Sequence, residues 1–239
     1  MRKLFVLLLL ITLHISNSAL AQDKPTLKPY TARYNVKFRG LSGGDIVFTL
    51  KNQGANQFVF SSRLLPNLLG GLFTSDQAQD TSTFMLEEGI LKPLQFTSED
   101  GRNNTENDIR YQFDWNSNQV KGHFKDQDFA LTVPRGVQDR LSIQLSASLA
   151  LQANKDPGKL IMLEKDELQE YTITRQGTER VSNDAGQFET VILKSERSGS
   201  DRVTRYWYAN SLGFIPVRAE RSTRGKVDIV MELKSFQFQ

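Results

Sequence analysis

Apolar and polar residues alternate along much of the chain. Tyr30, Ala32, Tyr34, Val36 and Phe38 share one face of an extended segment, and the residues between them are mostly polar. A glycine-rich turn at 40–44 ends this segment, and the pattern returns on both sides of a turn at 52–56. Period-two alternation interrupted by tight turns predicts antiparallel strands joined as hairpins.

Later segments repeat the pattern and bring the total to about a dozen expected strands, above the size of an average sheet. These segments are 109–115, 120–124, 129–133, 160–163, 171–174, 188–193, 203–208, 214–219 and 227–238. One segment, at about 138–153, predicts a helix, because Leu141, Leu145 and Leu149 follow the favourable N-cap Asp139 at four-residue spacing. We therefore expect a mainly β fold, a large antiparallel curved sheet that closes into a barrel or stays a half-barrel, with one packed helix.

The first 21 residues have the three parts of a secretory signal peptide. Arg2 and Lys3 supply positive charge, 4–13 are almost entirely apolar, and Ala19 and Ala21 form a small-x-small cleavage pattern. A membrane anchor is the alternative, but this apolar stretch is much shorter than the roughly 20 residues that span a bilayer. We expect cleavage after Ala21, export to the periplasm, and one domain over 22–239.

Composition excludes several classes of function. Cleavage removes Arg2 and Lys3 from the 30 basic residues and leaves 28 against 27 acidic ones, too balanced for a nucleic-acid-binding protein. The chain has no cysteine, which excludes disulfides, thiolate metal sites and lipid attachment. No second apolar run is long enough for a transmembrane helix, and no motif indicates a cofactor.

Residues for catalysis are scarce. After cleavage one histidine remains, His123, which Asp126 or Asp128 could steer as a general base in a hydrolase. Alternation instead places His123 on the polar face of a strand near a turn. Metal sites of the catalytic kind normally use two or three histidines, so we predict neither a metal site nor catalytic residues.

The alternation lapses at 64–73, where six large apolar residues surround Pro66, Gly70 and Gly71. Proline and glycine argue against a central strand, so we expect a loop or a short helical turn. Such a loop either plugs an open end of the sheet or forms a mobile lid or contact site, because exposed apolar patches mark interactions.

Aromatic residues form a second constellation, since the sequence contains fifteen Phe, six Tyr and two Trp. Most of them serve as core, but a concave aromatic face also suits an apolar ligand. The predicted ligand-binding residues combine this face, the helix and the apolar loop as a gate: Tyr34, Phe48, Phe60, Leu68, Leu69, Leu72, Phe73, Phe113, Trp115, Leu145, Leu149 and Trp207.

Three stretches together resemble the bacterial exported family called domain of unknown function 3108 (DUF3108). They are Tyr30-x3-Tyr34-x-Val36 with Gly40 and Gly44, then 138–142 (QDRLS), and then 177–179 with 186–191 (GQFETV). This resemblance implies export and a fold, but no activity. The segment 206–218, from YWYAN to Pro-Val-Arg, resembles a hairpin of LolA/LolB-type periplasmic lipoprotein carriers, which implies an incomplete barrel with a helical lid.

These observations favour a non-enzymatic binding or carrier protein of the cell envelope. Its ligand would be apolar, such as a lipid or the acyl chain of a lipoprotein. The alternative is a structural or scaffolding envelope protein that has a filled β core and binds a protein partner through the loop at 64–73. The sequence does not distinguish a filled interior from an open one.

Overall fold

The alternating segments form strands of one sheet. The computed structural model describes residues 25–68, 70–72, 75–102 and 105–239, and within them fourteen strands pair antiparallel. The elements are β1 Tyr30–Phe38, β2 Leu41–Gly54, β3 Gln57–Pro66, η1 Gly70–Leu72, β4 Gln79–Glu87, β5 Ile90–Glu99, β6 Ile109–Asp114, β7 Gln119–Phe124, β8 Gln127–Thr132, α1 Ser142–Gln152, β9 Gly158–Glu164, β10 Glu167–Asn183, β11 Gly186–Arg197, β12 Arg202–Ala209, η2 Asn210–Leu212, β13 Ile215–Thr223 and β14 Lys226–Phe238.

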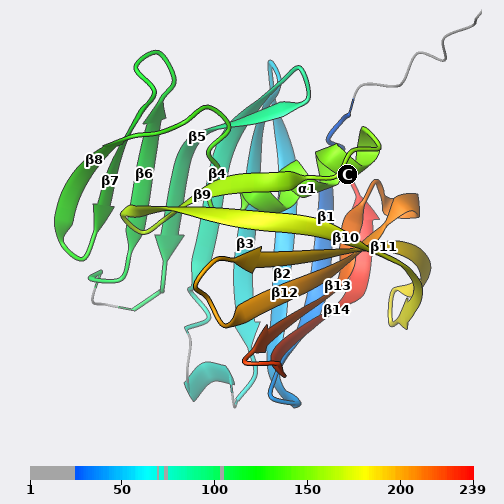
Figure 1. The fold of residues 1–239 in the computed structure, drawn as a ribbon. Coiled ribbons are helices and arrows are strands. Elements are labelled where there is room, and N and C mark those ends of the chain that lie inside the picture. Colours follow the sequence, from blue (N-terminus) through cyan, green and yellow to red (C-terminus); the bar gives the residue numbers. More distant parts are fainter. Residues whose placement is uncertain (1–24, 69, 73–74, 103–104) are drawn as a thin grey trace, which may run out of the picture.

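The first and last strands lie side by side in the middle of the sheet. The order runs from β8 to β1 and then from β14 to β9, so two meanders meet at the β1–β14 pair. The sheet curves strongly, and its edge strands β8 and β9 are not paired with each other (Figure 1). The predicted curved sheet with one helix is thus confirmed, in its open form.

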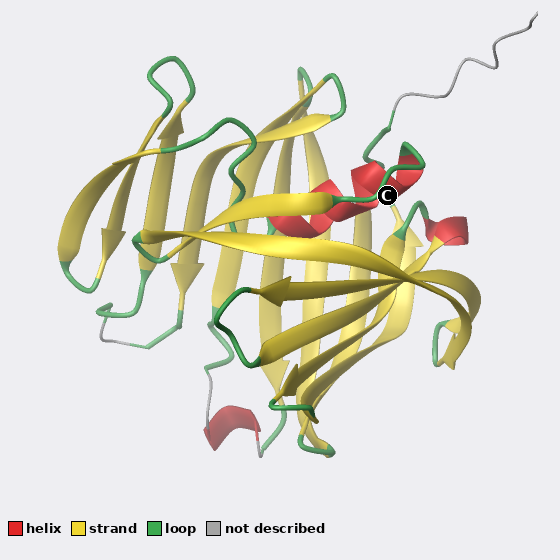
Figure 2. Ribbon diagram, viewed as in Figure 1, coloured by secondary structure: helices red, strands yellow, loops and turns green. Residues whose placement is uncertain are grey.

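The helix α1 lies against the concave side of the sheet (Figure 2). It begins at Ser142, and the turn before it is fixed by Asp139, which accepts hydrogen bonds from the backbone N–H groups of Leu141 (2.8 Å) and Ser142 (2.9 Å). Asp139 is completely buried, and its other oxygen accepts a 2.6 Å hydrogen bond from the Ser82 hydroxyl of β4. The helix start is therefore tied directly to the sheet.

The core fills the space between α1 and the first half of the sheet. Leu141, Leu145 and Leu149, at most 3% exposed, pack into the same cluster as the aromatic side chains of β1–β6. Ala147 and Leu151 face the other way and join Ile173 of β10, Leu193 of β11 and Tyr208 of β12 in a smaller cluster. One helix therefore separates two apolar regions.

Two sequence expectations need correction. The strands β4 and β5 lie in 79–99, for which no strand was expected, and β3 continues through Leu64 and Leu65 to Pro66, where a loop was expected. Pro66 pairs with Gly44 at the end of the β2–β3 ladder, a strand end that tolerates proline. The short helical turn expected near Gly70 is present as η1.

Two further expectations concern membrane segments and export. In the part of the chain that the structure describes, no helix is long and apolar enough to cross a membrane. The predicted signal peptide and its cleavage after Ala21 lie outside the described residues.

Candidate functional site

The predicted aromatic wall forms, but its side chains pack against one another. Phe48 lies 5.6 Å from the rings of both Tyr34 and Phe60, and all three side chains are at most 8% exposed. The Tyr34 hydroxyl donates a 2.7 Å hydrogen bond to the carbonyl oxygen of Pro216. With Leu145 and Leu149 over them, these residues form a filled core.

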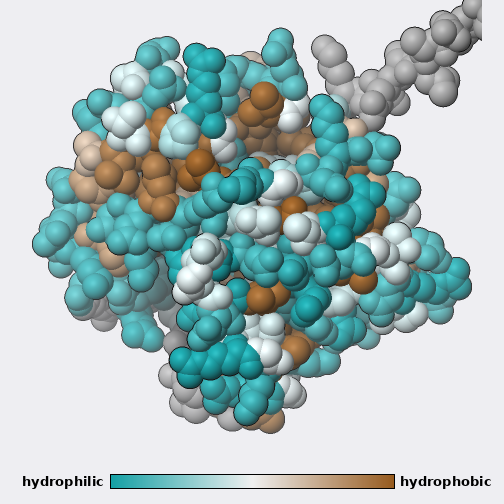
Figure 3. Space-filling model, viewed as in Figure 1, coloured by the Kyte–Doolittle hydropathy of each residue, from teal (hydrophilic) through white to brown (hydrophobic). Residues whose placement is uncertain are grey.

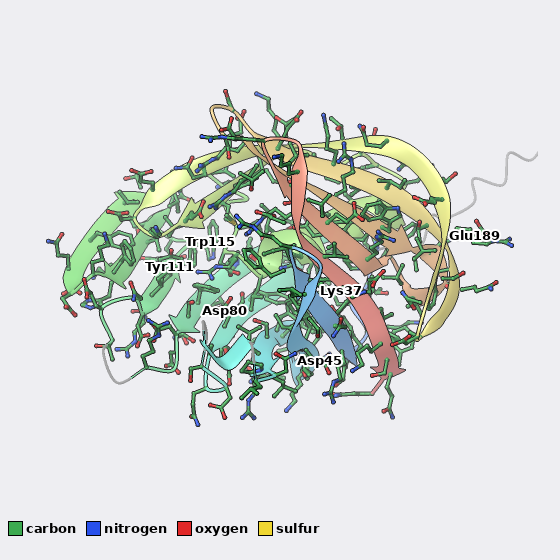
Figure 4. The ribbon with its side chains drawn as sticks, turned by 90° about the horizontal axis from the view of Figure 1, so that it is seen from below. Lys37, Asp45, Asp80, Tyr111, Trp115 and Glu189 are labelled. Carbon is green, nitrogen blue, oxygen red and sulfur yellow. The ribbon has the colours of Figure 1, made fainter. Side chains whose placement is uncertain are left out.

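Phe113 and Trp115 belong to the same apolar core near the β8 edge. Their rings stack at 5.9 Å, and the Trp115 indole N–H donates to the carbonyl oxygen of Pro93. Figure 4, seen from below, shows Trp115 and Tyr111 at the end formed by β6–β8, with Glu189 at the opposite end of the molecule. Figure 3 shows apolar surface gathered over β6–β8, whereas the surface over β10–β14 is mostly hydrophilic.

Trp207 belongs to the same buried cluster as Tyr34, Phe48 and Phe60, but it comes from the second half of the sheet, in β12. Successive residues of β12 point to opposite faces, so Trp207 is on the face opposite Tyr206 and Tyr208. Its indole N–H donates a 2.7 Å hydrogen bond to Glu179, and the Arg218 guanidinium lies 5.3 Å from its ring. The tip of the β10–β11 hairpin covers this face, because the Asn183 side chain donates to the carbonyl oxygen of Val217.

The predicted gate is only partly described. Leu69 and Phe73 lie outside the described residues, and Leu72 is placed only by its backbone in η1. Leu68 is 91% exposed. The loop is fixed by Asn67, whose side-chain amide donates to the carbonyl oxygen of Ser42 and whose side-chain oxygen accepts from the N–H of Gly70. The described part of the loop therefore lies beside the β1–β2 turn rather than over the interior (Figure 1).

His123 lies on the surface of the β7–β8 hairpin. Its Nδ1 is 2.7 Å from Oδ1 of Asp128, and the two side chains are 37% and 92% exposed. The pair borders a shallow surface depression of about 740 Å³, which Arg110 and Phe129 also line. Within the described residues no group of three or more His, Cys, Asp or Glu side chains could hold a metal ion.

A pocket that the sequence did not predict lies between α1 and strands β9–β13; we call it the helix pocket. Its volume is about 310 Å³, at the lower end for small-molecule sites. Its apolar wall comes from both α1 and the sheet: Ile143, Ala147, Met162, Ile173, Leu193 and Tyr208. The pocket exists because α1 presents the small Ala147, together with Leu151, to this half of the sheet, whereas Leu145 and Leu149 face the other half.

Polar groups line the rest of the helix pocket. Four arginines contribute, Arg140, Arg197, Arg202 and Arg221, together with one acid, Glu164. Burial raises the pKa of Tyr206 to about 12, so this hydroxyl stays protonated and can donate a hydrogen bond. Burial and the nearby Glu164 carboxylate also raise the pKa of Tyr171, which donates a 3.2 Å hydrogen bond to Glu164.

A second pocket, the terminal pocket, of about 400 Å³, lies where the N-terminal segment at 25–28 approaches η2 and Phe238. Leu145 lines it together with Tyr30, Leu50 and Ile215. Gln152 at the end of α1 closes it, since its side chain accepts from the N–H of Thr26 and donates to the carbonyl oxygen of Gly213. This pocket has no cluster of arginines.

One signal could have revealed the helix pocket. The sequence Tyr206-Trp207-Tyr208 places aromatic residues on both faces of one strand, which indicates that something covers each face. The hairpin tip covers one face and α1 approaches the other. The arginines gave no such signal, because arginine in alternate positions is also typical of a solvent-exposed face.

Fold and site define a class of protein: an open, strongly curved antiparallel sheet whose single described helix fills one half and leaves a pocket in the other. Residues 33–234 match the family described as protein of unknown function (DUF3108), and the chain belongs to this family. The predicted resemblance is thereby confirmed. No curated protein matches the sequence.

Solved structures that align with this chain share little sequence with it. A β-barrel-like protein of the unknown-function family DUF1849 from Brucella abortus aligns with a TM-score of 0.59 at 11% identity, over 89% of this chain and 98% of that chain. A candidate exported protein with a YmcC-like fold from Bacteroides fragilis gives a TM-score of 0.39 at 12% identity, over 89% and 97% of the two chains. A candidate lipoprotein from Parabacteroides distasonis gives 0.37 at 10% identity, over the same shares. The first of these shows a common fold, and the resemblance to LolA/LolB-type carriers stays a prediction.

Proposed function

We propose that this protein is a non-enzymatic binding or carrier protein for an apolar ligand, such as a lipid or the acyl chain of a lipoprotein. The observation that supports this proposal is the apolar wall of the helix pocket, where Ala147 and Leu193, both at most 2% exposed, border open space. Burying an acyl chain there would gain about 0.8 kcal/mol per CH2. The pocket is large enough for part of one chain, and the rest would extend toward solvent or a membrane.

Native mass spectrometry of protein extracted gently from the envelope tests this proposal. We expect a co-purified lipid, and we expect Ala147→Phe to lose it, because the larger ring would fill the pocket. The matched control is Ala150→Phe, on the same helix but outside both pockets. Ligand-free wild type, or equal lipid content in both variants, would argue against the helix pocket. Thermal unfolding checks that both variants fold. If Ala147→Phe does not fold, Ile143→Trp takes its place.

The proposed location is the periplasm or the inner face of the outer membrane, after removal of residues 1–21. The support is the signal-peptide pattern in the sequence. Cell fractionation and N-terminal sequencing test it, and we expect a periplasmic protein that begins at Gln22. An uncleaved chain in the inner-membrane fraction would contradict it.

The second candidate is an envelope scaffold with a filled β core. Two observations favour it: Tyr34, Phe48 and Phe60 fill the first half of the interior, and Leu68 extends 91% exposed from the loop. Under this function Leu68→Ser abolishes a protein partner in pull-downs without lowering stability. Ile90→Ser, at the exposed apolar residue that begins β5, is the matched control. An unchanged partner profile would leave the carrier function as the better account.

A further inference from the structure

The residues that line the helix pocket change from charged and polar to apolar along the strands toward α1. Arg197 is paired with Tyr171, and in the adjacent row Thr204 of β12 is paired with both Ser195 and Arg221. The next row toward α1 pairs Tyr206 with Leu193, and the following one pairs Tyr208 with Val191. Alternate residues of a strand share a face, so β11 and β12 lead from an arginine-rich mouth to an apolar interior.

The positive charge at this mouth is only partly neutralised. Arg221 Nε lies 3.1 Å from Asp228, Arg197 lies 3.7 Å from Glu164, and Arg140 lies 3.5 Å from Asp80. Arg202 forms no ion pair with any described residue. Its backbone is held opposite Thr223 in the β12–β13 ladder and by a 3.2 Å hydrogen bond from its N–H to the Ser200 hydroxyl.

Hydrogen-bond donors outnumber acceptors between the mouth and the apolar wall. Guanidinium groups have five N–H donors in a planar fork that matches carboxylate and phosphate oxygens. Tyr206 lies one row deeper, paired with Leu193, and its hydroxyl is protonated. A ligand that satisfied both regions would carry anionic oxygens at one end and an apolar chain at the other.

We propose that the helix pocket binds an anionic amphiphile, with the carboxylate or phosphate group against Arg202 and its neighbours and the chain against Ala147 and Leu193. This inference rests on the proposed carrier function and specifies its ligand class. Arg202 is the residue that selects the charge, because its guanidinium is free to form a bidentate pair. The other three arginines are held in place by their carboxylate partners.

A series of ligands with one chain and different headgroups tests this assignment. Dodecanoate, dodecyl phosphate, dodecanol and dodecylamine are titrated into the exported protein, with displacement of a fluorescent apolar probe as the readout. We expect at least one anion to bind about tenfold tighter than dodecanol, as one charge-assisted hydrogen bond would give, and dodecylamine to bind most weakly. The two anions distinguish a carboxylate ligand from a phosphate ligand.

Arg202→Gln should remove about tenfold of the affinity for the preferred anion and leave dodecanol binding unchanged. The matched control is Arg224→Gln, which removes the same charge from the neighbouring β13–β14 turn, where Arg224 is 82% exposed and outside the pocket. Equal affinity for dodecanol and both anions, or equal losses in the two variants, would overturn the anionic ligand but not the carrier function. Failure of every ligand to displace the probe would instead overturn the carrier function itself.

Discussion

The helix α1 packs differently against the two halves of the concave face. Under β1–β6, Phe48, Phe60 and their neighbours meet Leu145 and Leu149, and the interior is filled except at the terminal pocket beside Leu145. Under β9–β13 the same helix presents Ala147 to Leu193, and a pocket of about 310 Å³ remains. Aromatic richness therefore marks the stable core, and the space for a ligand lies where a small helical residue meets a strand that carries arginine and tyrosine.

The largest expected effect is in the filled half. Phe60→Ala should lower the free energy of unfolding by about 3–5 kcal/mol, because it leaves a cavity among side chains that cannot collapse into it. Urea denaturation measures this loss, with Phe38→Ala, at a 48% exposed position, as the control expected to cost below about 1 kcal/mol. Similar small losses in both variants would mean that the first half is not a packed core.

The next largest effect is expected at Asp139, which ties the start of α1 to β4. Asp139→Ala should cost about 2–3 kcal/mol, because it leaves the N–H groups of Leu141 and Ser142 and the Ser82 hydroxyl without a partner. Asp139→Asn keeps an acceptor and should cost less. Equal stability of the Ala variant and the wild type would show that the start of α1 is not fixed by this contact.

The pKa of Asp139 adds a pH dependence. Burial raises this pKa above its usual 3.8, so the ionised carboxylate is disfavoured in the folded state. Its stabilising contribution is complete below 3.8 and declines as the pH rises toward the folded-state pKa. The wild type should therefore lose stability relative to Asp139→Asn over that range in denaturation curves, and a constant difference would contradict this.

For Asp45, on the outer face of the sheet, we expect a pH dependence of stability with the opposite sign. Burial alone would raise its pKa, but hydrogen bonds from Lys234, Arg33 and Asn35 outweigh burial and lower the pKa below 3.8. This stabilisation is complete above 3.8 and is lost as the pH falls through the folded-state pKa. Asp45→Asn should cost about 1.5–2 kcal/mol at pH 7, and this cost should shrink progressively as the pH falls below 3.8. A cost that did not shrink in acid would indicate a loss of packing instead.

The smallest effect is expected at the loop. Leu68→Ser should change stability by less than about 0.5 kcal/mol, because a side chain that is 91% exposed buries little area. Under the carrier function it should also leave probe binding unchanged, since Leu68 does not line the helix pocket. A marked loss of probe binding would instead support the prediction that this loop acts as a gate.

The sequence predicted most strands because each has one buried and one solvent-exposed face, so apolar and polar residues alternate along it. It missed β4 and β5 because their buried positions include a polar residue, Ser82, which is satisfied by Asp139, and a proline, Pro93, beside a register shift. The helix pocket was missed for another reason. It depends on which side chains of α1 face which half of the sheet, and that orientation is set by tertiary contacts far apart in sequence.

The central claim is that ligand binds in the second half of the concave face and not among the aromatic residues of the first. Photo-crosslinking with a dodecanoate probe that carries a diazirine on its chain, followed by peptide mapping, tests it most directly. The account predicts modified residues in α1 and in β10–β12, around Ala147, Leu193 and Tyr208. Crosslinks concentrated in β2–β4, around Phe48 and Phe60, would contradict it.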